Sequence, residues 1–160
     1  MKYSVIRRTV QFFVALFFIC AISKAQTNNR IGLEEAKKAI AASNAIYFDS
    51  FAKNDSSIFI NRYAKDACIL APNAPAMCGR VATAKFFKSA YEEYGLRNGK
   101  FITTAVYGDG KEYVTEEGLW QSFDASGKLF DDGKFLVLWK NTSEGWKMFR
   151  DSFSSNHSPK

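Results

Sequence analysis

The sequence holds one histidine in 160 residues, and that residue, His157, lies three positions from the end of the chain. A histidine triad needs an imidazole fixed inside a folded site, and a His-rich metal site needs several such ligands. The sequence also has no Gly-rich phosphate loop of the usual spacing. These absences argue against a histidine-based hydrolase, a metal centre and a nucleotide-binding loop, and we expect no cofactor.

Positive charge is unevenly distributed along the chain. There are 22 Lys and Arg residues against 16 Asp and Glu residues, and the first 25 positions hold four of the basic residues and none of the acidic ones. The rest of the chain therefore carries 18 basic against 16 acidic side chains, and no Lys/Arg cluster of the kind that lines a nucleic-acid groove remains. We expect no nucleic-acid partner.

The first 25 residues have the three-part layout of a secretory signal peptide. A basic start is followed by an almost wholly apolar run from Val10 to Ile22, and Ser23-Lys24-Ala25 places small residues where signal peptidase reads them. The apolar run is shorter than the roughly 20 residues that a membrane-spanning helix needs. The sequence thus predicts cleavage near Ala25 and export to the periplasm or the medium, with no membrane contact afterwards. An uncleaved membrane anchor is the alternative.

Two cysteines remain after cleavage, Cys68 and Cys78, on either side of a proline-containing turn. An exported chain meets an oxidising compartment, in which this pair can form a cross-strand disulfide. Two buried free thiols are the other interpretation, and the sequence does not decide between them.

Periodicity divides the mature chain into helices followed by strands. Helices are expected over about 32–53, 57–63 and 81–94, and strands over 67–70, 101–107, 113–115, 119–123, 134–140 and 146–153. Asp131-Asp132-Gly133 is expected to form a hairpin turn, and Glu116-Glu117 a bend or a solvated edge. This order predicts an α+β fold with helices packed on an antiparallel sheet. The expected division is a signal peptide over 1–25, a flexible tail over 26–31, one domain over 32–154 and a disordered C-terminus over 155–160.

Three stretches together resemble the nuclear-transport-factor-2-like (NTF2-like) superfamily, and more narrowly its SnoaL-like, uncharacterised (DUF4440-type) members. They are Tyr47–Asp55, Tyr63–Pro72 with the following Gly79-Arg80, and Gly133–Lys140 with Gly145–Asp151. The likeness covers nearly the whole mature chain. It implies a cone in which three N-terminal helices pack on a strongly curved antiparallel sheet, with a pocket at the open end. Because members of this superfamily have many different activities, function must be argued from the pocket.

The resemblance also allows a comparison with the ketosteroid isomerase branch. A tyrosine on the first helix there donates to the substrate oxygen, and this position corresponds to Tyr47. The proton-transferring carboxylate falls at or near Ala71 and the second acid near Phe135, and neither side chain can carry a proton. The resemblance therefore implies that the isomerase set is incomplete.

Tyr47 and Asp151 are the two candidate catalytic residues. Tyr47 either anchors a ligand oxygen at the mouth of the cone or packs in the core. Asp151 follows Arg150 on the last expected strand, so the two side chains point to opposite faces. If Asp151 faces the pocket, desolvation raises its pKa and fits it for acid–base work, and if it faces outward it is a surface charge. Asp49 lies too far round the helix from Tyr47 to join it.

Aromatic residues are numerous enough to line an apolar pocket. Trp120 and Trp139 are candidate pocket residues together with Tyr47 and Asp151, and the other interpretation is that the tryptophans fill the core or a dimer interface. The sequence thus predicts a domain that binds an unknown apolar small molecule and pairs as a homodimer through its sheet. A SnoaL-like enzyme (isomerase, cyclase or hydrolase) and a protein-interaction module are the alternatives.

Overall fold

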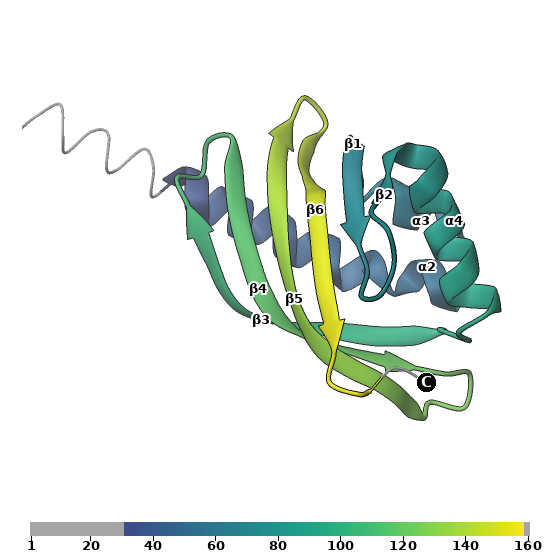
Figure 1. Ribbon diagram of the computed structural model, residues 1–160. Helices are drawn as coiled ribbons and strands as arrows, with labels where there is room; N and C mark the ends of the chain where they lie inside the picture. Colours follow the sequence, from purple (N-terminus) through teal and green to yellow (C-terminus); the bar gives the residue numbers. More distant parts are fainter. Residues whose placement is uncertain (1–30, 159–160) are drawn as a thin grey trace, which may run out of the picture.

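The computed structural model describes residues 31–158 and forms helices followed by a long run of strands (Figure 1). A helix over 31–47 opens the described chain. The elements that follow are α2 (Asp49–Ala52), α3 (Ser56–Ile60), β1 (Tyr63–Leu70), β2 (Met77–Cys78), α4 (Gly79–Glu92), β3 (Asn98–Gly108), β4 (Tyr113–Phe123), β5 (Leu129–Thr142) and β6 (Gly145–Ser155).

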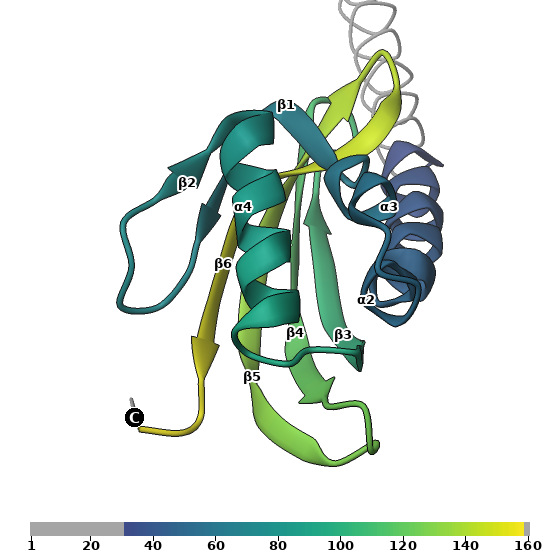
Figure 2. The same ribbon diagram turned by 90° about the vertical axis from the view of Figure 1, so that its right-hand side faces the viewer.

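The strands form one sheet in the order β2-β1-β6-β5-β4-β3. The first helix crosses one face of this sheet, while α3 and α4 lie beside β1 and β2 (Figures 1 and 2). The α+β cone, with helices packed on a curved sheet, is therefore confirmed. The sheet is mixed, because β1 pairs with β6 in parallel while the other pairs are antiparallel. Consecutive strands joined by tight turns must run antiparallel, whereas β1 and β6 are separated by the other elements and are free of that constraint.

Several element boundaries differ from those expected. The first helix stops at residue 47 and restarts as α2, so the single helix expected to reach about residue 53 is interrupted. Asp55 caps α3, since its Oδ1 accepts the Ser57 amide at 2.9 Å. β4 is continuous through Glu116-Glu117, and Asp131-Asp132-Gly133 lies inside β5, so the expected bend and turn at these places are both wrong.

The core fills the space between the helices and the inner face of the sheet. Ala36 and Ile40 of the first helix share one buried cluster with Val137, Trp139 and Met148 of β5 and β6. The rings of Phe51, Phe59 and Phe87 pack together and join α2, α3 and α4. Each large side chain that is fully buried stabilises the fold by about 1.5–3 kcal/mol.

Glycine is required on the inner face of β4. A Cβ at Gly118 would lie 2.7 Å from the ring carbon Cζ of Phe135 and would also meet the Ile102 carbonyl oxygen. Only a residue without a side chain lets the Phe135 ring lie across the strand at this place, where it lines the pocket described below.

The two cysteines of the described chain are bonded to each other. Cys68 and Cys78 form a disulfide and pair across β1 and β2. The structure therefore has the cross-strand disulfide and not two free thiols.

The described C-terminal residues, up to residue 158, are ordered. Residues 155–158, expected to be disordered, are held to β5 by hydrogen bonds such as those from Asn156 Nδ2 and His157 Nε2 to the two Asp132 carboxylate oxygens, both at 2.8 Å. The expected signal peptide and most of the tail lie outside the described residues, although residue 31 is already helical. Within the described chain, we find no helix that is both long enough and apolar enough to span a membrane.

Candidate functional site

A pocket of about 680 Å³ opens between α4, the loop before β2 and the inner face of the sheet. Its walls are mostly aromatic and aliphatic. The apolar and aromatic lining includes Tyr47, Phe48, Ala71, Met77, Phe86, Phe101, Trp120, Phe130, Phe135 and Phe153, and the polar lining residues are Lys85, Lys88, Ser89, Glu93, Ser122, Asp131 and Asp151. A cavity of this volume with mostly apolar walls is typical of small-molecule sites.

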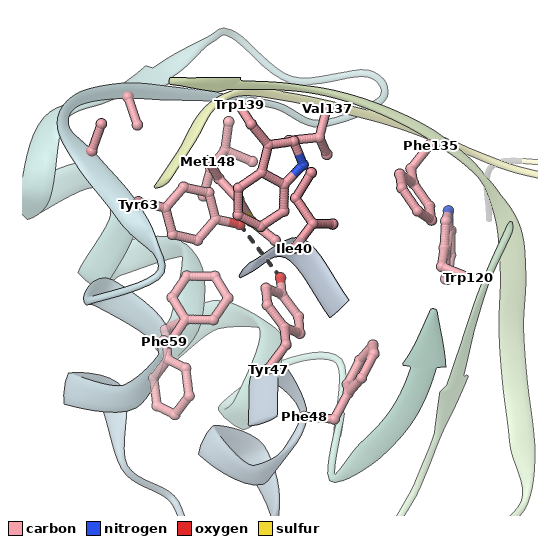
Figure 3. Close-up of a cluster of buried hydrophobic side chains, with 14 of the residues drawn as sticks. Ile40, Tyr47, Phe48, Phe59, Tyr63, Trp120, Phe135, Val137, Trp139 and Met148 are labelled. Atoms are coloured by element: carbon pink, nitrogen blue, oxygen red, sulfur yellow. Dashed lines mark hydrogen bonds between the residues drawn. The ribbon is translucent and has the colours of Figure 1, made fainter. Parts of the chain in front are cut away.

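Tyr47 and Asp151 line the pocket, and together with the buried Tyr63, which is not in the lining, they form a hydrogen-bonded group that we call the polar floor. Tyr63 donates its hydroxyl to Asp151 Oδ2 at 2.6 Å, and the Tyr47 and Tyr63 hydroxyl oxygens lie 3.5 Å apart. Because the single hydroxyl proton of Tyr63 goes to Asp151, Tyr47 is the donor to Tyr63. Figure 3 shows the two tyrosines with their hydroxyls facing each other beneath Trp139. The three residues thus form a chain of hydrogen bonds from Tyr47 to Asp151.

Burial sets the electrostatics of the polar floor. Asp151 is 8% exposed, and this desolvation raises its pKa to about 6. The nearby charge of Glu116 adds to the increase, while the hydrogen bond from Tyr63 opposes it. The pKa values of Tyr47 and Tyr63 are also raised, first by burial and then by the charge of Asp151. Both tyrosines therefore remain protonated donors at neutral pH, while Asp151 titrates close to it.

These positions decide between the two interpretations of Asp151, whereas Tyr47 belongs both to the pocket lining and to the buried core. Tyr47 and Asp151 both line the pocket and belong to one network, so Asp151 faces inward. Arg150 faces away from it, with its guanidinium 3.7 Å from the Phe149 ring centroid. Asp49 is not in the pocket lining, as expected, and its exposed carboxylate pairs with Lys53 at 2.9 Å.

Trp120 and Trp139 have different positions. Trp120 lines the pocket as expected and packs edge-on against Phe153. Trp139 does not belong to the described pocket lining, so its predicted pocket role is wrong. It is fully buried in the core, where its indole N–H donates to Glu116 Oε2 at 3.0 Å. Figure 3 shows Trp120 beside Phe135 and well apart from Trp139.

Glu116 and Tyr63 are the two polar residues that the sequence did not identify. Glu116 is fully buried and accepts hydrogen bonds from Asn44 at 2.7 Å, Thr103 at 2.6 Å and Trp139. Burial raises its pKa, and the three hydrogen bonds oppose that increase. One signal was present, because Glu116 has the same strand parity as Val114 and Trp120, which face inward. Tyr63 lies 88 positions from Asp151, and no local pattern links the two.

The two positions that matched isomerase acids are also in the pocket. Ala71 and Phe135 both line it, so groups without a transferable proton occupy the matched positions. Asp131 lies at the edge of the pocket, where Ser155 Oγ donates to it at 2.7 Å. Among residues 31–158, no group of three or more His, Cys, Asp or Glu side chains is placed to hold a metal ion.

Comparison with solved protein structures identifies the fold of this chain. No protein-family model and no curated protein sequence matches the chain. Among solved structures, a ketosteroid isomerase-like protein from Erwinia carotovora atroseptica SCRI1043 superimposes with a TM-score of 0.61 at 19% identity, covering 74% of this chain and 95% of that one. An NTF2-like protein of unknown function from Shewanella oneidensis MR-1 has a TM-score of 0.62 at 15% identity, covering 74% and 98%.

A domain of unknown function with a cystatin-like fold from Nostoc punctiforme PCC 73102 has a TM-score of 0.65 at 15% identity, covering 76% of this chain and 78% of that one. The chain therefore has the NTF2-like fold, as the resemblance implied. The narrower DUF4440-type placement stays a prediction. At these identities the likeness establishes the fold and leaves the activity to be argued from the site.

Proposed function

We propose that the protein binds an apolar small molecule in the pocket, with one polar group of the ligand held at the Tyr47–Tyr63–Asp151 network. The observation that carries this proposal is the 680 Å³ cavity, whose walls are mostly apolar and where Tyr47 and Asp151 belong to one hydrogen-bonded network. Apolar walls supply affinity by removing ligand surface from water, and a buried polar group fixes the ligand's orientation. A protein-interaction module with a vestigial pocket is less well supported, because a cone filled by its own side chains would leave no such cavity.

Binding can be tested with N-phenyl-1-naphthylamine, a neutral probe whose fluorescence rises in apolar surroundings. Ser89 on α4 lines the pocket, whereas Glu92 is an exposed residue of the same helix outside the lining. We expect Ser89→Trp to weaken probe binding at least tenfold, because the indole occupies pocket volume, and Glu92→Trp to leave it within twofold. Equal binding by the two variants, or no binding by the wild type, would rule out this pocket as the site.

Acid–base catalysis is the second function that a specific observation favours. Asp151 is a buried carboxylate with a pKa raised to about 6, and a tyrosine network holds it at the edge of an apolar cavity. A general base works best when its pKa lies near the operating pH. In this interpretation Asp151 removes a proton from a carbon next to a carbonyl group, and Tyr47 exchanges its 3.5 Å hydrogen bond to Tyr63 for one to the developing oxyanion.

This activity can be measured without knowing the substrate. 2-Tetralone is apolar and exchanges its α-protons for deuterium in D₂O, which NMR follows directly. An enzyme of this kind would accelerate the exchange above the rate in buffer, and Asp151→Asn would abolish the acceleration while retaining affinity for the ketone. Exchange at the buffer rate with bound 2-tetralone would leave the binding function and remove the enzymatic one.

We also propose that the protein is a homodimer that pairs through the outer face of its sheet. Ile102, Leu119 and Leu136 point outward from β3, β4 and β5 and are 41%, 45% and 48% exposed. Neighbouring apolar side chains on an outer sheet face are suited to a protein contact. We expect sedimentation to give a dimer at micromolar concentration and Leu136→Glu to give a monomer. A wild-type monomer would refute the pairing.

Export is proposed for the whole chain from the predicted signal peptide. The Cys68–Cys78 disulfide supports it, because such bonds persist in oxidising compartments. N-terminal sequencing of protein from the native host should begin at or near Gln26. A chain that retains Met1 and stays in the cytoplasmic fraction would contradict export.

A further inference from the structure

One carboxylate oxygen of Asp151 has no hydrogen-bond partner among residues 31–158. Its Oδ2 accepts the Tyr63 hydroxyl, and among the described residues no group is hydrogen-bonded to Oδ1. Asp151 lines the pocket and keeps 8% of its surface exposed, so a bound molecule can reach this oxygen. An ionised carboxylate oxygen only accepts hydrogen bonds, and its partner must therefore be an N–H or O–H group of the ligand.

Charge inside the cone is unbalanced. Glu116 and Asp151 lie at one level of the sheet, since both pair in register with Val137 of β5. The polar residues buried in the described chain include these two acids and no Lys, Arg or His. A buried ionised carboxylate is costly unless donors or a positive charge compensate it. Among residues 31–158, Glu116 has three side-chain donors and Asp151 has only the Tyr63 hydroxyl, so a positive charge beside Asp151 would be strongly favourable.

The walls near the floor suit a cation as well. Tyr47, Phe101, Phe135 and Phe153 are aromatic residues that line the pocket. The face of an aromatic ring carries partial negative charge and attracts a cation within about 6 Å of its centroid. A carboxylate combined with such rings recognises a protonated amine better than a neutral group or an anion.

The remaining charged groups around the pocket offset one another. Lys85 and Lys88 of α4 lie on the exposed rim, together with Glu93 just after that helix and Asp131 of β5. These are two positive and two negative groups in contact with solvent, which screens their fields. The groups that face Asp151 from inside are Tyr47 of the first helix, Tyr63 of β1 and Glu116 of β4, and none of them brings a positive charge. Asp151 is therefore the group that distinguishes a cationic ligand from a neutral or anionic one.

Building on the proposed binding function, we infer that the ligand is an organic cation: a protonated amine on an apolar body, whose N–H donates to Asp151 Oδ1 while the body lies among the aromatic walls. This inference names the chemical class of the ligand for the same pocket.

Three probes that share one skeleton test the inference by calorimetry at pH 7.5. They are 4-phenylbutylamine, 4-phenylbutan-1-ol and 4-phenylbutanoate, which share a phenyl ring on a four-carbon chain and carry a cationic, a neutral and an anionic head group, respectively. We expect the amine to bind at least tenfold more tightly than the alcohol, and the butanoate to bind most weakly. At pH 4.5 the amine-to-alcohol ratio should fall below about threefold, because Asp151 takes up a proton below its pKa of about 6 while an alkylamine keeps its charge.

Two variants complete the test. Asp151→Asn should bring the amine-to-alcohol ratio at pH 7.5 close to one, and Asp49→Asn, which removes an exposed carboxylate from α2, should leave it within twofold of the wild type. Equal binding of the amine and the alcohol to the wild type would overturn the inference and leave the apolar binding function intact. Tighter binding of the butanoate would assign the selectivity to the rim lysines instead. Failure of all three probes to bind would count against the proposed function as well. If Asp151→Asn does not fold, the comparison of the wild type at pH 7.5 and 4.5 still decides whether Asp151 selects the amine.

Discussion

A buried carboxylate with a raised pKa makes the stability of this protein depend on pH in a direction that can be predicted. The pKa of Asp151 is about 6 in the folded chain against 3.8 for the unperturbed group, so between these values the folded state holds a proton that the unfolded state has lost. Stability from this group is therefore fully present below pH 3.8 and is lost as the pH rises through 6. At 1.36 kcal/mol for each pKa unit, the whole loss is about 3 kcal/mol, of which about 2 kcal/mol falls between pH 4.5 and 7.5.

Replacement of Asp151 by Asn removes the titration and keeps a carbonyl oxygen for the Tyr63 hydroxyl. We expect the stability of Asp151→Asn relative to the wild type to rise by about 2 kcal/mol between pH 4.5 and 7.5. Urea unfolding at several pH values, followed by tryptophan fluorescence, measures this difference. Exposed acids whose pKa values are lowered, such as Asp66 and Asp132, contribute less to the stability of the fold as the pH falls. This loss is the same in both proteins, so it cancels in the difference between them.

Asp49→Asn is the matched control, because it removes a carboxylate that is exposed and paired with Lys53. Its stability relative to the wild type should stay constant to within about 0.5 kcal/mol over the same range, as expected for a surface ion pair. If the Asp151→Asn difference is also constant, or if the wild type is the more stable protein at pH 7.5, then Asp151 is not the desolvated carboxylate described above.

Two further changes test the structure around the site. Trp139→Phe removes one donor from the buried Glu116 carboxylate and should lower the free energy of unfolding, measured in urea, by about 1.5–3 kcal/mol. As a control, Trp146→Phe at a partly exposed position should lower it by less than about 1 kcal/mol. Equal losses in the two variants would contradict the role of the Trp139–Glu116 bond. Reduction of the Cys68–Cys78 disulfide, which closes a loop of ten residues, should lower the free energy of unfolding by about 3 kcal/mol. A variant with serine at both positions should not respond to dithiothreitol. An unchanged urea midpoint on reduction of the wild type would refute this prediction.

The raised pKa has a functional meaning beyond stability. An ionised Asp151 at pH 7.5 destabilises the fold, although asparagine could accept the same Tyr63 hydrogen bond. A group that costs stability and lies at the edge of a cavity is typical of binding and catalytic sites. The amine inference and the acid–base alternative both depend on this carboxylate, and the charge series separates them from a purely apolar pocket.

Local sequence pattern was sufficient for the fold class. Period-3.6 and period-2 patterns placed the helices before the strands and indicated an α+β fold, while the cone was implied by the resemblance to the NTF2-like superfamily. The resemblance also indicated Tyr47 as a candidate residue, and the alternation of side chains along the last strand indicated Asp151. They did not locate the end of the first helix or the continuity of β4, because short polar stretches inside an element resemble turns.

Tertiary structure decided which polar groups meet. Strand parity shows that Glu116 lies on the same face as Trp120, but only the register with β5 and the packing of the first helix bury it beneath Asn44 and Trp139. The Tyr63–Asp151 bond joins residues 88 positions apart through the parallel pairing of β1 and β6. The spacing along a strand determines which side chains share a face. Strand register decides which face is buried, and with it the pKa values and the pocket, since a shift of one residue would turn each of these side chains to the other face.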